Sequence, residues 1–199
     1  MMKNFHKKRI VVGITGASGL PYAIKVIEML QKVDCEIFCA ISNAAKIVSQ
    51  SELDMNLEDE LKKVGIDKIY QEDDFSAPMA SGSFKFDAMV VVPCSMKTLG
   101  KIANSIADNL IVRSAEVALK ERRKLVIVPR ESPMAITQIK NMLTLSQAGA
   151  IVLPASPAFY FKPKTVEDMI TFIAARILTS LEIEQTFLKE WGCNEKKLS

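Results

Sequence analysis

The 199-residue sequence predicts a three-layer α/β/α domain of the Rossmann-like or flavodoxin-like kind, built on one parallel sheet. Short, continuously apolar segments alternate along the chain with amphipathic segments whose apolar residues recur at helical spacing. Continuous apolar strands are typical of a parallel sheet, because helices cover both of its faces. The composition, 49% hydrophobic and 25% charged, is that of an ordinary globular chain and excludes a disordered or fibrous protein.

Each predicted strand ends in a break and leads into a helix. The first strand, 9–15, is apolar and β-branched, and Gly16 and Gly19 end it. The helix that follows, 21–33, carries Ile24, Ile27 and Leu30 at helical spacing. The same alternation predicts strands at 36–41, 88–92, 125–128 and 150–153, and helices at 43–51, 96–103, 107–120, 133–148 and 166–181. Segment 54–85 departs from it, with a helix at 57–64, a weak strand at 68–70 and an acidic loop at 72–83.

Charge, histidine and cysteine usage exclude several classes of function. The 26 basic residues are spread among 23 acidic ones, so we expect no nucleic-acid partner. The longest uncharged stretch, 141–161, contains two prolines and fails as a membrane span. The single histidine, His6, excludes Ser-His-Asp and Cys-His catalysis and histidine metal sites, so no metal is expected. The four cysteines form no CxxC pair, which favours a cytoplasmic protein.

Polar residues gather directly after the predicted strands. In an open parallel sheet, ligands bind at the carboxyl ends of the strands. Residues 15–19 follow the first strand, Ser42 the second, residues 95–98 the fourth, and Arg130 and Glu131 the fifth. Three of these turns place small hydroxyl residues at helix starts, where free N–H groups and the helix dipole favour a phosphate.

The first turn favours a mononucleotide over a dinucleotide. It lacks the GxGxxG motif, because Ile14 occupies a required glycine position. Ser42 stands near where a dinucleotide-binding chain places an acidic residue for the ribose.

Helix capping is the alternative explanation of three serines in these turns. For Ser132, which precedes Pro133, capping is the favoured interpretation, since proline suits the first helical position. For Ser18 and Ser42, ligand contact and capping both stay open.

Two further sets of residues could have a structural role instead of a role in ligand binding or catalysis. Arg130 and Glu131 could form a buried ion pair, but ligand contact is favoured because burying charges is costly without a partner. Cys94 could be a thiolate nucleophile at a helix start, but a small buried residue at a strand end is favoured.

Several motifs in chain order resemble those of the UbiX-type flavin prenyltransferases. The resemblance extends over about residues 9–191. It is carried by TGASG at 15–19, IS at 41–42, PCSMKTL at 93–99, ADNL at 107–110, ALKERR at 118–123, VPRE at 128–131 and PAFY at 157–160.

The resemblance implies an enzyme that joins a dimethylallyl group from dimethylallyl phosphate to N5 and C6 of reduced FMN. The prenylated FMN would then serve a UbiD-type decarboxylase. The resemblance also implies a homo-oligomer, a dodecamer, with FMN sites at subunit contacts. An FMN-dependent decarboxylase of the same fold, similar to cysteine decarboxylases, and a non-catalytic FMN carrier remain the alternatives.

Site residues follow from the resemblance by position. The expected FMN-binding residues are Gly16, Ala17, Ser18, Ser42, Ser95, Met96, Lys97, Thr98 and Arg130. Tyr160 and Arg176 would bind dimethylallyl phosphate, together with Lys120 and Glu131. The expected catalytic residues are Lys120, Arg130 and Glu131.

Two aromatic positions and the domain bounds complete the expectations. Phe75 stands where related chains often carry tryptophan, and Trp191 matches a family tryptophan near the active site. We expect one flavoprotein domain at 9–182, between a frayed start at 1–8 and a helical tail at 183–199.

Overall fold

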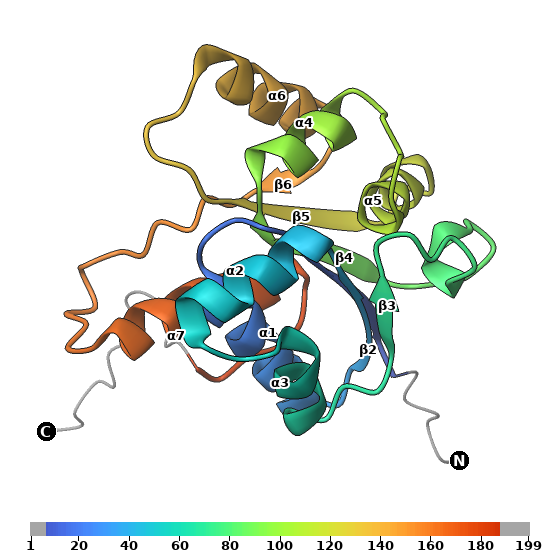
Figure 1. Ribbon diagram of the computed structural model, residues 1–199. Helices are drawn as coiled ribbons and strands as arrows, with labels where there is room; N and C mark the ends of the chain where they lie inside the picture. Colours follow the sequence, from blue (N-terminus) through green and yellow to red (C-terminus); the bar gives the residue numbers. More distant parts are fainter. Residues whose placement is uncertain (1–6, 188–199) are drawn as a thin grey trace, which may run out of the picture.

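The computed structural model describes residues 7–187 and confirms the predicted α/β fold (Figure 1). Within these residues, six parallel strands form one sheet in the order β3-β2-β1-β4-β5-β6. The strands are β1 (Arg9–Ile14), β2 (Glu36–Ile41), β3 (Ile69–Gln71), β4 (Ala88–Cys94), β5 (Lys124–Pro129) and β6 (Ile151–Val152). This is the order of a doubly wound sheet.

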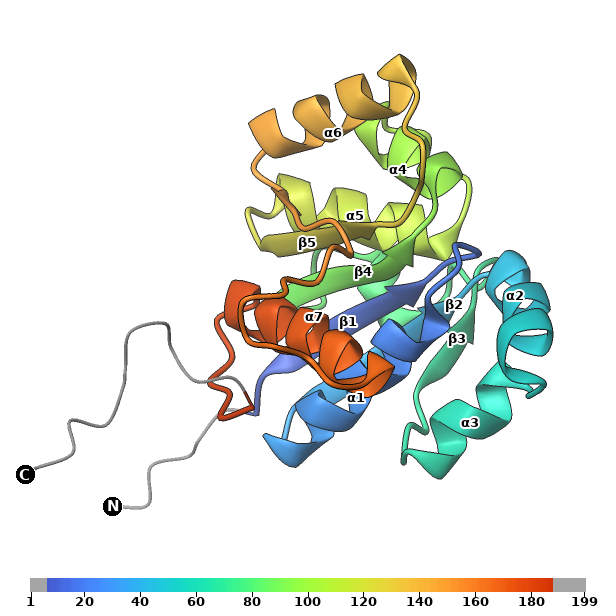
Figure 2. The same ribbon diagram turned by 90° about the vertical axis from the view of Figure 1, so that its left-hand side faces the viewer.

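Helices cover both faces of the sheet. They are α1 (Leu20–Lys32), α2 (Asn43–Leu53), α3 (Leu57–Lys63), α4 (Met96–Ala103), α5 (Leu110–Lys120), α6 (Ile136–Gln147) and α7 (Val166–Ser180), with a short 3₁₀ helix η1 (Pro78–Ala80). Figure 2 shows α1, α2, α3 and α7 on one side of the sheet and α4, α5 and α6 on the other.

The hydrophobic core is divided by the sheet into two clusters. On β1, Ile10 and Val12 pack into the cluster that contains the buried residues of α1 and α7. Val11, between them, belongs to the opposite cluster, with the buried residues of α5. All three are fully buried. Because both faces of β1 are covered, its sequence is continuously apolar instead of alternating.

Two helices begin later than the sequence predicts. Helix α6 starts at Ile136, not at residue 133, and the side chain of Gln138 accepts the Ala135 N–H at 2.7 Å. The prediction that Ser132 caps this helix is therefore wrong. Helix α5 starts at Leu110, not at residue 107, because the Asn109 side chain accepts the Val112 N–H at 2.9 Å and fixes the helix start there.

The two ends of the chain lie largely outside the described residues. These include His6, Trp191 and most of the predicted tail; residues 183–187, the described part of that tail, form no helical turn. In the described part of the chain, no helix has the length and apolarity to cross a membrane. Over the same residues, no three His, Cys, Asp or Glu side chains are grouped as a metal ion would require.

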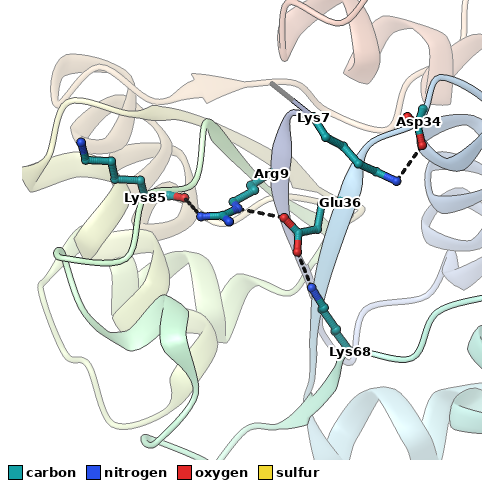
Figure 3. Close-up of polar contacts among 6 residues, drawn as sticks. All are labelled: Lys7, Arg9, Asp34, Glu36, Lys68 and Lys85. Atoms are coloured by element: carbon teal, nitrogen blue, oxygen red, sulfur yellow. Dashed lines mark hydrogen bonds and ion pairs between the residues drawn. The ribbon is translucent and has the colours of Figure 1, made fainter. Parts of the chain in front are cut away.

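A network of ion pairs ties the amino ends of the strands together (Figure 3). Glu36, at the start of β2, accepts from Arg9 Nε at 2.8 Å and pairs with Lys68 just before β3. Arg9 also donates to the Lys85 carbonyl oxygen at 3.3 Å. Hydrogen bonds from Lys68 and Arg9 lower the pKa of the Glu36 carboxyl below its ordinary value of 4.5.

We expect Glu36→Gln to lower the free energy of unfolding by about 0.5 to 1 kcal/mol near pH 7. Because folding lowers the pKa of Glu36, its contribution is present above the ordinary value and is lost as the pH falls through the lowered pKa. Urea unfolding of the variant and the wild type at about pH 7 and about pH 3 measures the difference, which shrinks at the lower pH. Asp67→Asn, at an exposed position of the same edge, is the control. A deficit that is equal at both pH values contradicts the assignment.

Candidate functional site

The carboxyl ends of β1 and β4 form the point where the strand order reverses. β1 leads into α1 on one side of the sheet and β4 into α4 on the other (Figure 2). The backbone ladder between the two strands ends at the pair Gly13 and Val91. In open α/β sheets, ligands bind in the crevice that such a divergence creates.

The loop after β1 is pressed against α2. A Cβ added to Gly16 would lie 2.4 Å from the Ala44 Cβ, so only glycine fits. Gly19 has a φ of 111°, caps α1, and donates its N–H to Glu52 Oε2 at 3.1 Å. The possibility that Ser18 caps α1 is therefore wrong. Ala17, between them in the loop, is buried.

The backbone N–H groups at the start of α2 already have acceptors from side chains of this chain. Ser42 caps α2 by accepting the Ala45 N–H at 3.1 Å, which confirms the capping interpretation. The Glu72 carboxylate also accepts the Asn43 N–H at 3.0 Å, so a negative charge already lies at this helix start.

Helix α4 keeps backbone donors available. Ser95 caps it by accepting the Thr98 N–H at 3.3 Å. The N–H groups of Met96 and Lys97 have no acceptor among the described residues. An anion therefore finds donors and a positive dipole end at α4.

Arg130 and Glu131 do not form the buried ion pair considered as an alternative. Arg130 is exposed, and its Nε donates to the Ser18 carbonyl oxygen at 3.0 Å. The Glu131 carboxylate accepts the Ser132 N–H at 3.0 Å. Both charges therefore stay at the carboxyl edge, and the guanidinium bridges the loops after β5 and β1.

A cavity of about 500 Å³ opens beside this bridge. It is lined by Ser18, Gly19, Pro21, Tyr22, Glu52, Leu53, Arg130, Ala155, Val166 and Ile170. Its volume lies in the range of small-molecule sites. One guanidinium and one carboxylate stand against a largely apolar wall, an arrangement that suits a ligand with an anionic group and a flat or apolar body.

A smaller cavity, of about 340 Å³, lies at the opposite edge of the sheet. Four of its charged lining residues belong to ion pairs, namely Lys7, Asp34, Glu36 and Lys68 (Figure 3). The larger cavity is therefore the candidate site.

Lys120 and Arg176 lie away from the cavity within one chain. Lys120 ends α5, before β5 begins, and its Nζ lies 3.0 Å from Glu121 Oε1. Arg130 directly follows β5, so about 20 Å of strand separates the two. Arg176 is exposed on α7 and lies about 9 Å along the helix from Ile170, the nearer of the two α7 residues that line the cavity.

Tyr160 belongs to an aromatic cluster at the start of α7. Its ring makes edge contacts with Phe161 and Phe172, at centroid distances of 6.1 and 5.9 Å. Phe161 and Phe172 stack at 4.9 Å. The cluster anchors the loop between β6 and α7, and neither Tyr160 nor the half-exposed Phe75 lines the cavity.

Sequence reasoning missed two carboxylates at this edge, Glu52 and Glu72. Glu72 directly follows β3 and so obeys the rule that located the other residues. It was missed because β3 is only three residues long and weakly patterned. Glu52 lies near the end of α2, where nothing in the local pattern indicates its contact with Gly19.

Cys94 is a buried strand-end residue, as favoured from the sequence. Burial raises the pKa of its thiol strongly, and burial raises the pKa of Cys39 to about 12. Neither sulfur is a thiolate near neutral pH.

Comparison with known proteins agrees with this geometry. The chain matches the family model "Flavoprotein" over residues 2–178. A flavin prenyltransferase UbiX of Methanocaldococcus jannaschii is 53% identical over 184 residues, which cover 92% of this chain and 98% of the relative.

Two solved structures superimpose closely. AnUbiX (PadA1), in complex with FMN and dimethylallyl pyrophosphate, has a TM-score of 0.90 and 38% identity, covering 96% of this chain and 100% of that one. A dodecameric FMN-dependent UbiX-like decarboxylase from Escherichia coli O157:H7 has a TM-score of 0.85 and 39% identity, covering 89% and 96%.

Because their thiols are buried and protonated, we expect Cys39 and Cys94 to resist alkylation in the folded protein. Iodoacetamide at about pH 8, followed by peptide mass spectrometry, measures the labelling of each cysteine. Protein unfolded in guanidinium is the control and is labelled at both positions. Rapid labelling of Cys94 in the native protein would show that its thiol is exposed and reactive.

Proposed function

The chain belongs to the Flavoprotein family, among the UbiX flavin prenyltransferases, and from this premise we propose that it joins a dimethylallyl group to N5 and C6 of reduced FMN. The donor is dimethylallyl phosphate, and the prenylated FMN passes to a UbiD-type decarboxylase. The observation that carries the proposal is the cavity between the loop after β1 and the starts of α1 and α7, with Arg130 at its wall. A similar chain, AnUbiX, is described in complex with FMN and dimethylallyl pyrophosphate.

The residues at the carboxyl edge fit FMN. The N–H groups of Met96 and Lys97, at the start of α4, are donors for a phosphate. Tyr22, Leu53 and Val166 supply an apolar wall for a flat ring system. When bound, reduced FMN supplies the nucleophilic ring atoms that take up the allylic carbon.

The chain's own residues serve the departure of phosphate and the loss of a proton. Lys120, Arg130 and Arg176 are cations that stabilise the negative charge on the leaving phosphate. Tyr160 binds the same phosphate. Glu131, whose carboxylate is held by the Ser132 N–H, accepts the proton, a step that needs no histidine.

The separation of Lys120 from Arg130 supports a site shared between subunits. A cation about 20 Å from the cavity reaches the same phosphate only if a second copy supplies it. We propose that the protein forms a homo-oligomer, a dodecamer like the E. coli relative.

Helix α6 offers a surface for this assembly. Leu145 is the buried residue of this helix. Ile136, Ile139 and Leu143 are 66%, 47% and 58% exposed and share one helix face. An apolar stripe of this kind is typical of a subunit contact.

The transfer itself is tested by incubating the protein anaerobically with reduced FMN and dimethylallyl phosphate and measuring the mass of the extracted flavin. We expect a flavin heavier by one five-carbon prenyl unit. A parallel sample with the diphosphate donor identifies the preferred leaving group. Unmodified FMN in both samples would contradict the proposal and favour an FMN carrier or a decarboxylase of the same fold.

We expect Glu131→Gln and Lys120→Ala each to slow prenylation at least about tenfold, or about 1.4 kcal/mol in the barrier, while FMN stays bound. The reason is that one variant lacks the proton acceptor and the other lacks a phosphate cation. Lys62→Ala, at an exposed position of α3, is the matched control and keeps full activity. Full activity in both test variants would overturn the assigned roles.

Mixing the two slow variants tests whether subunits share the site. After dissociation and reassembly together, some sites combine an intact Glu131 from one copy with an intact Lys120 from another, so activity rises above that of either variant alone. Light scattering verifies that mixed oligomers have formed. Reassembled mixtures that stay as slow as the separate variants would place the whole site within one chain.

A further inference from the structure

Thr15, which follows β1, joins the loop after β1 to the turn that leads from β4 into α4. Its side chain is buried, with 1% of the residue exposed. The hydroxyl donates to the Pro93 carbonyl oxygen at 2.7 Å and accepts the Ser95 N–H at 2.8 Å. One side chain therefore satisfies a backbone acceptor and a backbone donor on either side of Cys94, in a segment about 80 residues away in sequence.

The hydrogen bonds of the Thr15 hydroxyl link β1 to β4 beyond the point where the backbone pairing of the two strands ends. The pairing of β1 with β4 ends at Gly13 and Val91, and the pairing of β4 with β5 is irregular between Val91 and Cys94. The Thr15 N–H also donates to the Pro93 carbonyl oxygen, at 3.3 Å, but the hydroxyl is the group that reaches Ser95. The position of the turn into α4 thus depends on a side chain and not on sheet pairing alone.

Ser95, whose N–H is bound by Thr15, is also the residue that caps α4. It caps the helix by accepting the Thr98 N–H, so fixing Ser95 fixes the first turn and the N–H groups of Met96 and Lys97. Gly16, next to Thr15, is pressed against Ala44 of α2. Together, Thr15 and Gly16 hold the first loop between α2 and α4.

We propose that Thr15 is a positioning residue for FMN, which acts through Ser95 to hold the backbone donors of α4 in place for the FMN phosphate. This inference rests on the proposed function. Thr15 is buried beneath the loops, so its effect is transmitted through the backbone it binds.

Substitutions can separate the hydroxyl from the shape of the side chain. Thr15→Val keeps the branched shape but removes the hydroxyl, which leaves the Pro93 carbonyl and the Ser95 N–H without this partner. Thr15→Ser keeps the hydroxyl and removes a methyl group. Ser49→Ala is the matched control, because Ser49 is also buried and its hydroxyl donates to a backbone carbonyl, that of Met55, at 2.9 Å.

The experiment measures the Kd for FMN by flavin fluorescence and the Tm of each full-length variant. We expect Thr15→Val to raise the Kd at least about tenfold and Thr15→Ser to stay within about threefold of the wild type. Ser49→Ala lowers the Tm but leaves the Kd unchanged, because a structural hydroxyl far from α4 affects folding only. If the valine variant does not fold, Thr15→Ala, which introduces no new contact, takes its place.

Two results would overturn the inference while leaving the proposed function intact: a wild-type Kd in Thr15→Val, or an equal loss in Thr15→Val and Thr15→Ser. Failure of the wild type to bind FMN would overturn the proposed function itself, and the role of Thr15 with it.

Discussion

Where β1 and β4 part, the sheet stops supplying hydrogen bonds to its own backbone, and side chains must take over. Buried N–H and carbonyl groups require partners wherever the ladder ends. Thr15 hydrogen-bonds to the backbone of the turn into α4, and Arg130 donates to the backbone of the loop after β1. The shape of the cavity and the placement of the helix starts around it both depend on these side-chain bridges.

The helix starts at this edge of the sheet differ in the charge that lies beside them. Glu52 and Glu72 bring carboxylates to N–H groups at the starts of α1 and α2. Arg130 lines the cavity together with Glu52, and the open donors of α4 follow β4. Because negative charge is favoured near helix starts, the two acids occupy positions that an anionic ligand would otherwise seek. Among the starts of α1, α2 and α4, the start of α4 is therefore the one left open to an anionic group.

The strands of the sheet could be predicted from the sequence because they are buried on both faces and therefore continuously apolar, as β1 shows. Most residues of the carboxyl edge could be predicted as well, because parallel strands end on the same side of the sheet. Contacts made between distant segments were not predictable. The bond from Gly19 to Glu52 depends on how α2 packs against the first loop, and the late start of α6 depends on a Gln138 contact that competes with the proline signal at residue 133. Motif matching could place Lys120 in a site, but it could not show that one chain holds it at the far end of β5.

Among the described α-helices, α6 has the fewest buried residues. Its packing within its own subunit comes from the buried Leu145 and the partly buried Met142, and short helices are marginal without packing. In an isolated chain, local opening of α6 therefore costs less than local opening of α5, which has seven buried residues. A second copy that covered Ile136, Ile139 and Leu143, as proposed above, would stabilise the helix by mass action, and the protection of its amide hydrogens against exchange with solvent would then depend on protein concentration.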